Sequence, residues 1–138
     1  MKYAVGGNMQ AAQRFSTDIV DLLERTDEVQ IEPRSPDGRR TKPVTIWVVV
    51  DAGEVYVRSY RGVNGRWYRA LRQQPMGVLH VDGREIPFRA VHIDDPATIA
   101  RVSEAFRRKY EGRWPQETAD MLKDEVLGTT LRLEPVSS

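Results

Sequence analysis

The apolar residues of this 138-residue chain recur with two different periods, and each period predicts a different kind of element. A spacing of three and four residues is typical of an amphipathic helix. It predicts one helix that Ser16 or Thr17 caps, a longer one that begins after Asp95 and stops at Gly112, and a short one around residues 117–123. The apolar stripes of the first two are Phe15, Ile19, Leu22 and Leu23, and then Ile99, Val102, Phe106 and Tyr110.

Alternating apolar and polar residues predict strands in several other segments. The continuous apolar run V-T-I-W-V-V-V, residues 44–50, predicts the most buried strand. Asp82-Gly83 is a strong hairpin signal that pairs His80 with Glu85. The expected strands lie near residues 29–31, 44–50, 55–58, 77–81, 84–93 and 129–135. About six strands, mostly antiparallel, and about four helices predict an α+β fold, a small barrel or curled sheet with helices covering its ends.

The stretch 55–76 joins a strand to a short helix, and the rest of the chain is organised around it. The strand gives way to a turn containing Gly62 and Gly65, and Asn64 is the expected N-cap of the helix. Pro75 ends that helix, because the residue before a proline disfavours the α region. Val55 and Val57 fall on one strand face and Tyr56 and Arg58 on the other, while Trp67, Ala70 and Leu71 share one helix face.

The same stretch is rich in arginine, and no acid lies between Glu54 and Asp82. A strand end, a glycine turn and a helix start that carry excess arginine are typical of an anion site, and phosphate is the obvious anion. Arg69 and Arg72 point away from the apolar helix face, which favours solvent exposure for these two. The arginines are Arg58, Arg61, Arg66, Arg69 and Arg72, of which Arg58 and Arg66 are favoured as ligand contacts.

Composition narrows the class of protein. The length predicts one domain over residues 15–138, preceded by a tail over residues 1–14. The chain contains no cysteine, no signal peptide and no apolar segment long enough to cross a membrane, so a cytoplasmic location is expected. The net charge of +1 arises from two basic clusters, residues 34–42 and 58–72, in an acidic remainder. Local clusters fit a small anionic ligand better than a broad nucleic-acid surface.

Catalytic and metal-binding motifs are missing from the sequence. There is no G-x-S-x-G, H-E-x-x-H, P-loop or G-x-G-x-x-G pattern, and no metal site is expected. His80 opposite Glu85 is interpreted as a half-exposed cross-strand pair. The sequence names no catalytic residue, so if the protein is an enzyme, a cofactor carries the difficult step.

The tryptophans have open roles. Trp67 could stack on a ligand ring, but its i, i+4 partner Leu71 favours core packing. Trp114 and Tyr110 could cover a substrate pocket or anchor the end of the long helix. Trp47 belongs either to the core or to a dimer interface.

One long segment resembles a known superfamily. The order R-x-x-K-P-V-T-I-W-V-V-V-D-x-G-E-V-Y-V-R-S, followed by G-R-W-Y-R-A-L-R-Q-Q-P-M-G-V-L-H-V, is similar to the FMN-binding split-barrel superfamily. The likeness is greatest to the branch of deazaflavin-dependent nitroreductases, and more distant to pyridoxamine-phosphate oxidases. It covers residues 39–93 and indicates a bacterial family within that superfamily.

The resemblance implies a six-stranded antiparallel split β-barrel that forms a homodimer, with the cofactor in a groove between subunits. It implies that the strand end, turn and helix start hold the cofactor phosphate, and that the ring lies along residues 41–46. The implied cofactor-binding residues are Thr41, Lys42, Thr45, Arg58, Ser59, Arg61, Gly65 and Arg66. The lysine after the serine of the oxidases is replaced here, as is the Gly-Gly pair of the deazaflavin branch. FMN, a deazaflavin coenzyme and no cofactor therefore all stay open.

Three hypotheses for function follow. The first is a flavin- or deazaflavin-dependent oxidoreductase that transfers a hydride or electrons to a small organic substrate. The second is a non-catalytic binding protein for a phosphorylated ligand. The third, disfavoured by the clustered charge, is a small barrel that binds single-stranded nucleic acid.

Overall fold

The computed structural model describes residues 14–136, so residues 1–13 of the predicted tail lie outside the described part. Arg14 donates a hydrogen bond from Nη1 to the Ala52 carbonyl oxygen at 3.2 Å. The strands are β1 (Glu28–Pro33), β2 (Val44–Trp47), β3 (Val49–Asp51), β4 (Glu54–Val57), β5 (Met76–Val81), β6 (Arg84–His92) and β7 (Leu131–Pro135). The helices are α2 (Thr17–Glu24), α3 (Arg66–Gln73), α4 (Pro96–Tyr110), α5 (Pro115–Met121) and α6 (Asp124–Leu127), with a 3-10 turn η1 (Gly62–Asn64).

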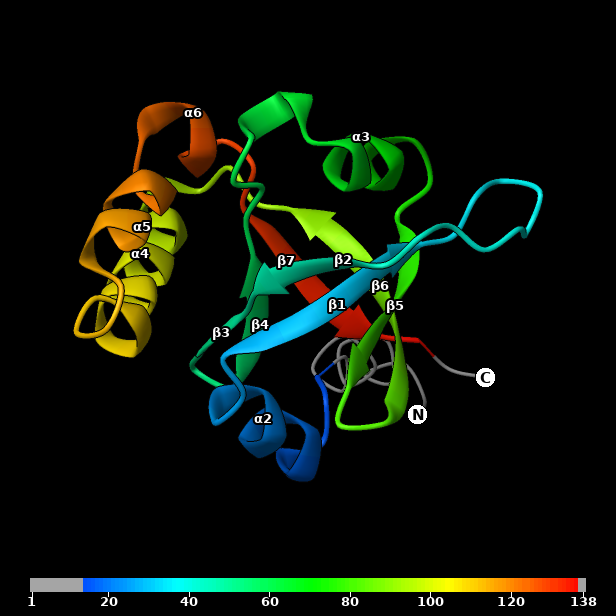
Figure 1. Cartoon of the computed structure of the whole chain (residues 1–138), viewed down its shortest axis with the longest axis horizontal. Helices are drawn as coiled ribbons and strands as arrows, with labels where there is room; N and C mark the ends of the chain where they lie inside the picture. The colour runs from blue at the N-terminus through cyan, green and yellow to red at the C-terminus, as the bar shows by residue number, and fades with distance from the viewer. Residues whose placement is uncertain (1–13, 137–138) are drawn as a thin grey trace, which may run out of the picture.

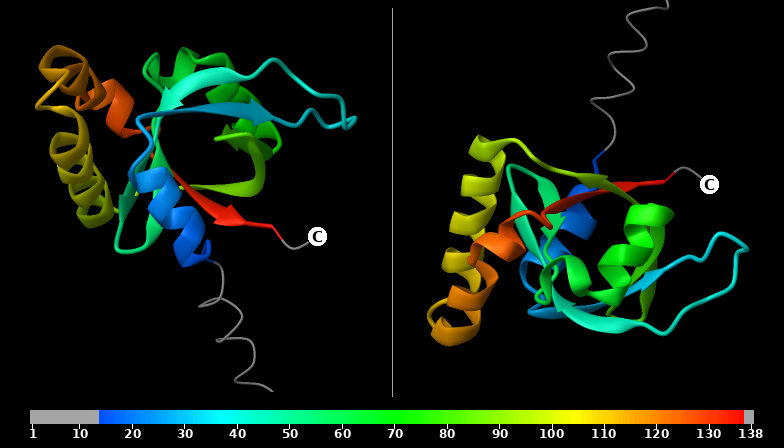
Figure 2. Two further views of the ribbon diagram at one scale, coloured as in Figure 1. Left: turned by 60° about the horizontal axis from the view of Figure 1, so that its bottom comes forward. Right: turned by 90° about the horizontal axis from the view of Figure 1, so that it is seen from above.

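Within residues 14–136 the strands form one antiparallel sheet in the order β2-β1-β5-β6-β7-β4-β3. Its two outer strands, β2 and β3, follow each other in the chain and are separated only by Val48. The sheet therefore curls round until its two edges meet, and the strands form a nearly closed barrel (Figures 1 and 2). The predicted architecture, an antiparallel barrel with flanking helices, is confirmed.

The strand count corrects one prediction. The sequence predicted a single strand over 44–50 and six strands in all, whereas the described residues contain seven, because that run breaks at Val48. The Val48 N–H donates to Tyr110 Oη at 3.1 Å, and the Val48 carbonyl accepts from Lys109 Nζ at 2.7 Å. Since side chains of α4 engage both backbone groups, Val48 leaves the sheet ladder, and the chain changes its partner from β1 to β4.

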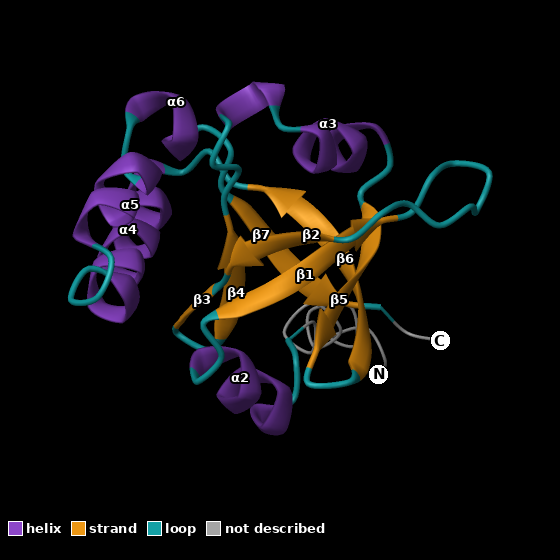
Figure 3. Cartoon of the chain, in the orientation of Figure 1, coloured by secondary structure: helices purple, strands orange, loops and turns teal. Residues whose placement is uncertain are grey.

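Alternation along β4 divides the core into two clusters. Val55 and Val57 point into the barrel, whereas Tyr56 points outward against α4, as the sequence predicted. Helices α2 and α3 lie at opposite ends of the barrel and extend its inner cluster (Figure 3). The outer cluster packs α4, α5 and α6 against β3 and β4 through Val49, Tyr56, Ile93, Val102, Ala105, Phe106, Tyr110, Met121 and Val126.

Most helix boundaries agree with the sequence prediction. Ser16 and Asp95 each accept a hydrogen bond from the backbone N–H three residues on, and so cap α2 and α4. The short helix expected near 117–123 is α5. The expected cap Asn64 was wrong, because Asn64 ends η1 and Gly65 precedes α3 without a side-chain cap. Within residues 14–136, none of the helices has the length and apolar character that a membrane span requires.

Candidate ligand-binding cleft

A cleft of about 840 Å³ opens between β2, the segment 58–66 and helix α5. Small-molecule sites commonly occupy about 300–1,000 Å³, so its size suits a cofactor or substrate. Of the predicted cofactor residues, it brings together Thr45, Arg58, Ser59, Arg61, Gly65 and Arg66. The other lining residues are Glu28, Val44, Ile46, Trp47, Tyr60, Asn64, Trp67, Trp114, Glu117 and Met121.

The turn after β4 owes its shape to two glycines and a serine. Ser59 Oγ donates to the Gly62 carbonyl at 2.7 Å, and the Ser59 N–H donates to Thr129 Oγ1 at 2.9 Å. Gly62 has a φ of +65°, which favours glycine. A Cβ on Gly65 would lie 2.4 Å from Ser59 Oγ, so the close approach there also requires glycine. Arg61 therefore directly precedes this fixed turn, and Arg66 directly follows it.

Arg58 is buried in the wall of the cleft, with a relative exposure of 1%. Its guanidinium donates to Thr130 Oγ1 at 2.9 Å, to Ser103 Oγ at 3.0 Å, and to the carbonyls of Met121 at 3.3 Å and Ile99 at 2.9 Å. All four acceptors are neutral oxygens, and no carboxylate among residues 14–136 forms an ion pair with it. Burial lowers the pKa of Arg58 to about 10. The cleft wall thus contains a buried positive charge that has no counter-ion in the described part of the chain.

The other arginines of the segment fall into two groups. Arg61 and Arg66 are exposed, line the cleft, and form no ion pair with any described residue. Arg69 and Arg72 are exposed on α3 and lie outside the lining of the cleft. This division agrees with the sequence-based expectation that the latter two face solvent.

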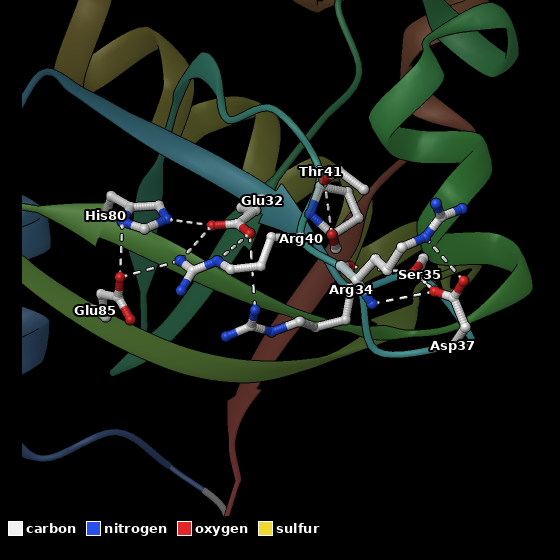
Figure 4. Close-up of polar contacts among 10 residues, drawn as sticks. Glu32, Arg34, Ser35, Asp37, Arg40, Thr41, His80 and Glu85 are labelled. Atoms are coloured by element: carbon white, nitrogen blue, oxygen red, sulfur yellow. Dashed lines mark hydrogen bonds and ion pairs between the residues drawn. The ribbon is translucent and has the colours of Figure 1, made fainter.

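Only part of the segment predicted to contact the ring lines the cleft. Thr45 lines the cleft, while Thr41 and Lys42 lie in the loop before β2 and do not line it. Thr41 Oγ1 donates to the Pro33 carbonyl at 2.8 Å, which ties this loop to the end of β1 (Figure 4).

A charge network beside that loop holds the β1–β2 connection (Figure 4). Glu32 is buried and accepts from Arg40 Nε and Nη2, both at 2.8 Å, while His80 Nε2 lies 2.7 Å from Glu32 Oε1. The bidentate bond from Arg40 outweighs burial and lowers the pKa of Glu32 to about 2. His80 pairs with Glu85 in register, as predicted, but its short contact is with Glu32. The network steadies the chain just before β2.

Aromatic rings form the far wall of the cleft. Trp47 stacks on Tyr110 with ring centroids 3.9 Å apart and planes 5° apart, and Trp114 lies 5.9 Å from Trp47. Trp47 and Trp114 are half-buried and line the cleft, whereas Tyr110 is buried in the outer core. Trp67 is buried in the barrel core, as its spacing from Leu71 indicated.

Sequence reasoning missed the acidic members of the cleft, Glu28 and Glu117. Glu28 reads as the polar position that opens an alternating strand, and Glu117 as an ordinary first-turn acid of a helix. Neither pattern carries a signal for a cleft, because the tertiary fold alone brings β1 and α5 to the same opening. In the described part of the chain, no group of three or more His, Asp or Glu side chains could hold a metal ion.

Comparison with known families and structures identifies the class of protein that this fold defines. The strands form a split barrel, the fold that the resemblance noted from the sequence implied. Residues 19–133 match the family DUF2255, described as uncharacterized proteins conserved in bacteria, and the chain belongs to that family. The comparison with curated proteins gives no match.

Solved structures share the fold at low sequence identity. A conserved hypothetical protein from Mycobacterium tuberculosis matches with a TM-score of 0.60 and 19% identity, over 92% of this chain and 83% of the other. HutZ, a heme storage protein from Vibrio cholerae, matches with a TM-score of 0.61 and 12% identity, over 91% and 92%. An F420-H2-dependent reductase matches with a TM-score of 0.56 and 12% identity, over 82% and 96%. At these identities the likeness concerns the fold.

Proposed function

We propose that this protein binds a phosphorylated flavin or deazaflavin in the cleft and uses it to transfer a hydride, or two electrons, to a small organic acceptor. The observation that carries the proposal is Arg58, a buried cation in the cleft wall whose hydrogen bonds all go to neutral oxygens. An anion in the cleft would supply the missing negative charge. A cofactor phosphate beside Arg61 and Arg66 is such an anion.

The energetics of charge burial support this assignment. Removing an ion from water costs several kcal/mol even after the protein relaxes, unless an opposite charge lies close by. Directed hydrogen bonds to a charged group contribute roughly 1.5–3 kcal/mol each. Arg61 and Arg66 can form such bonds, and the N–H groups of the first turn of α3, beginning at Arg66, have no acceptor within the helix.

The ring system of the cofactor is proposed to lie along β2. Val44 and Ile46 line the cleft there and offer an apolar surface, and the Thr45 hydroxyl offers a polar contact at the strand edge. Thr41 and Lys42, just before β2, are proposed to contact the rim of the ring. When bound, the cofactor supplies the hydride or electron chemistry, while the arginines provide a positive field that favours its reduced, anionic form.

Assembly as a homodimer is part of the proposal. Among the described residues, Val44, Tyr60 and Val63 are the large apolar side chains that stay exposed, at 40%, 58% and 62%. Val44 and Tyr60 line the cleft, and Val63 belongs to the adjacent turn η1. A second subunit that covered these residues would turn the open cleft into a groove between subunits.

Two alternatives use the same surface. One is a protein that binds a phosphorylated ligand without turnover. It stays an alternative because HutZ, which shares the fold, is named as a heme storage protein. Single-stranded nucleic acid is the other, but the free arginines of the cleft, Arg61 and Arg66, are too few for a long phosphate track. A reduced-nicotinamide or reduced-deazaflavin oxidation assay separates the oxidoreductase from the storage protein.

Arginine variants test the proposed anion site. Arg61→Ala and Arg66→Ala should each weaken FMN or F420 binding by about 1.5–3 kcal/mol, roughly ten- to hundred-fold. Arg72→Ala is the matched control, since it removes the same charge from an exposed position of α3 outside the cleft. Equal losses from all three variants, measured by equilibrium titration, would indicate a diffuse electrostatic surface and contradict the proposal.

A further inference from the structure

The aromatic wall of the cleft leaves tryptophan surface available to a ligand. Trp47 is covered on one side by Tyr110, and Trp114 is covered on one side by the Arg113 guanidinium, 4.4 Å from its ring centroid. The two indoles lie 5.9 Å apart with their planes inclined by 44°, and both line the cleft. This arrangement is a half-open aromatic corner.

Each indole of the corner has a carboxylate beside it. Glu28 is the cross-strand partner of Trp47 between β1 and β2, and Glu117 follows Trp114 by three residues at the start of α5. Both glutamates line the cleft, and neither forms an ion pair within residues 14–136. Asp27, the residue before Glu28, does form an ion pair, with Arg113.

Two other acids near the cleft, unlike Glu28 and Glu117, are paired with described side chains. Asp27 accepts from Arg113 Nη2 at 2.7 Å and so helps to fix Arg113 over Trp114. On the α5 side, Asp120 accepts from Tyr60 Oη at 3.0 Å and pairs with Lys123 at 3.1 Å. Asp27 and Asp120 are thus already paired, whereas Glu28 and Glu117 line the cleft and form no ion pair with any described residue.

We propose that this corner, formed by Trp47, Trp114, Glu28 and Glu117, is a subsite for an organic cation, an ammonium or protonated amine on the acceptor substrate. Indole faces attract cations more strongly than other aromatic faces, and neighbouring carboxylates add to that attraction. The identification of the occupant as the acceptor rests on the proposed function. The cation selectivity of the corner does not rest on the proposed function.

The cleft is consequently polarised. The cationic wall around Arg58, Arg61 and Arg66 receives the anion of one ligand, and the acidic aromatic corner receives the cation of the other. An anionic acceptor is repelled from the corner by two carboxylates, so the site discriminates among substrates by charge.

Calorimetric titration with benzyltrimethylammonium tests the subsite, with benzyl alcohol and benzoate as neutral and anionic analogues at matched ionic strength. We expect the cation to bind about tenfold more tightly than the alcohol, and benzoate not to displace the cation from the corner. Glu28→Gln and Glu117→Gln should each weaken the cation by about three- to tenfold. Glu24→Gln, the same change at an exposed position of α2 outside the cleft, should leave it unchanged.

The outcomes separate this inference from the proposed function. The subsite would be overturned if the cation and the alcohol bound equally, or if neither glutamate variant weakened binding of the cation. Neither result would bear on FMN binding, which tests the proposed function. Competition between FMN and the cation would also overturn it, because the corner would then belong to the cofactor ring. Retained cation binding at saturating FMN supports it.

Discussion

At the scale of single residues, two buried charges are satisfied in opposite ways. Glu32 meets Arg40, His80 and Arg34, the last at 3.7 Å, so its charge is compensated within the protein. The hydrogen bonds of Arg58 within residues 14–136 all go to neutral oxygens, and its guanidinium lies 5.2 Å from the Phe106 ring centroid. The first residue is therefore part of the framework, whereas the second has no described carboxylate as a partner, which is the basis of the proposed anion site.

The pairing of Glu32 predicts a pH dependence of stability. Its pKa falls from an ordinary 4.5 to about 2 in the folded protein, so the unfolded chain takes up the proton first as the pH falls. The stabilisation is complete above pH 4.5 and is lost as the pH falls to about 2. Full loss corresponds to about 3 kcal/mol, and about 1–2 kcal/mol is expected because Arg40 is half-exposed and screened by solvent.

Urea unfolding at a series of pH values measures this contribution. In Glu32→Gln, the free energy of unfolding should fall less steeply than in wild type as the pH decreases from 4.5 to 2. Lys42→Met, at an exposed position of the same loop that forms no ion pair with any described residue, is the control and should keep the slope. The same slope in wild type and Glu32→Gln would refute the network as a source of stability.

Alternation alone placed Arg58 on the outward face of its strand, but could not predict its burial. That burial depends on Ser103 in α4 and Thr130 before β7, which are more than forty residues away in sequence. The contacts of Glu32 were unpredictable for a similar reason. They require the loop before β2 to fold back so that Arg40 reaches β1.

At the scale of elements, periodicity predicted most of the secondary structure. The β5–β6 hairpin at Asp82-Gly83 and the cap of α4 at Asp95 are local features, so they can be predicted directly from the sequence. The break at Val48 is not local, because side chains sixty residues later cause it. A continuous apolar run cannot show where a distant helix will draw a strand out of its sheet.

The turn between β4 and α3 carries a prediction at this scale. Gly65→Ala places a Cβ against Ser59 Oγ, so the hydroxyl must rotate away from the Gly62 carbonyl. The loss of that bond should lower the free energy of unfolding by about 1 kcal/mol and should weaken FMN binding several-fold. Gly112→Ala, where a Cβ would meet no atom within 4 Å, is the control in thermal unfolding.

A double variant makes this prediction sharper. Ser59→Ala removes the hydroxyl that a new Cβ at position 65 would meet, so Gly65→Ala should cost much less in that background. Additive losses in the double variant would show that the proposed contact does not limit the turn.

At the scale of the whole molecule, the barrel leaves its cleft open on one side. Val44 and Tyr60 are exposed in the lining of the cleft, and Val63 is exposed in the adjacent turn η1. We expect a two-fold dimer that buries at least about 1,600 Å² in total. Light scattering at micromolar concentration should give twice the chain mass.

A charge placed on that surface tests the dimer without disturbing the core. Val63→Glu should shift the mass toward the monomer and should also weaken FMN binding, because the groove would lose its second wall. Val136→Glu offers a comparable change at the half-buried end of the described chain, away from the cleft. A wild-type monomer at these concentrations would contradict the expected assembly.

The central claim is that the arginine turn recognises a phosphate on a flavin-type cofactor. Titration of the protein with FMN and with riboflavin, which differ only in that phosphate, tests the claim most directly. At physiological salt we predict that FMN binds at least tenfold more tightly, a difference of about 1.4 kcal/mol. Equal affinities for FMN and riboflavin would contradict the account, because Arg58, Arg61 and Arg66 would then have no anion to bind.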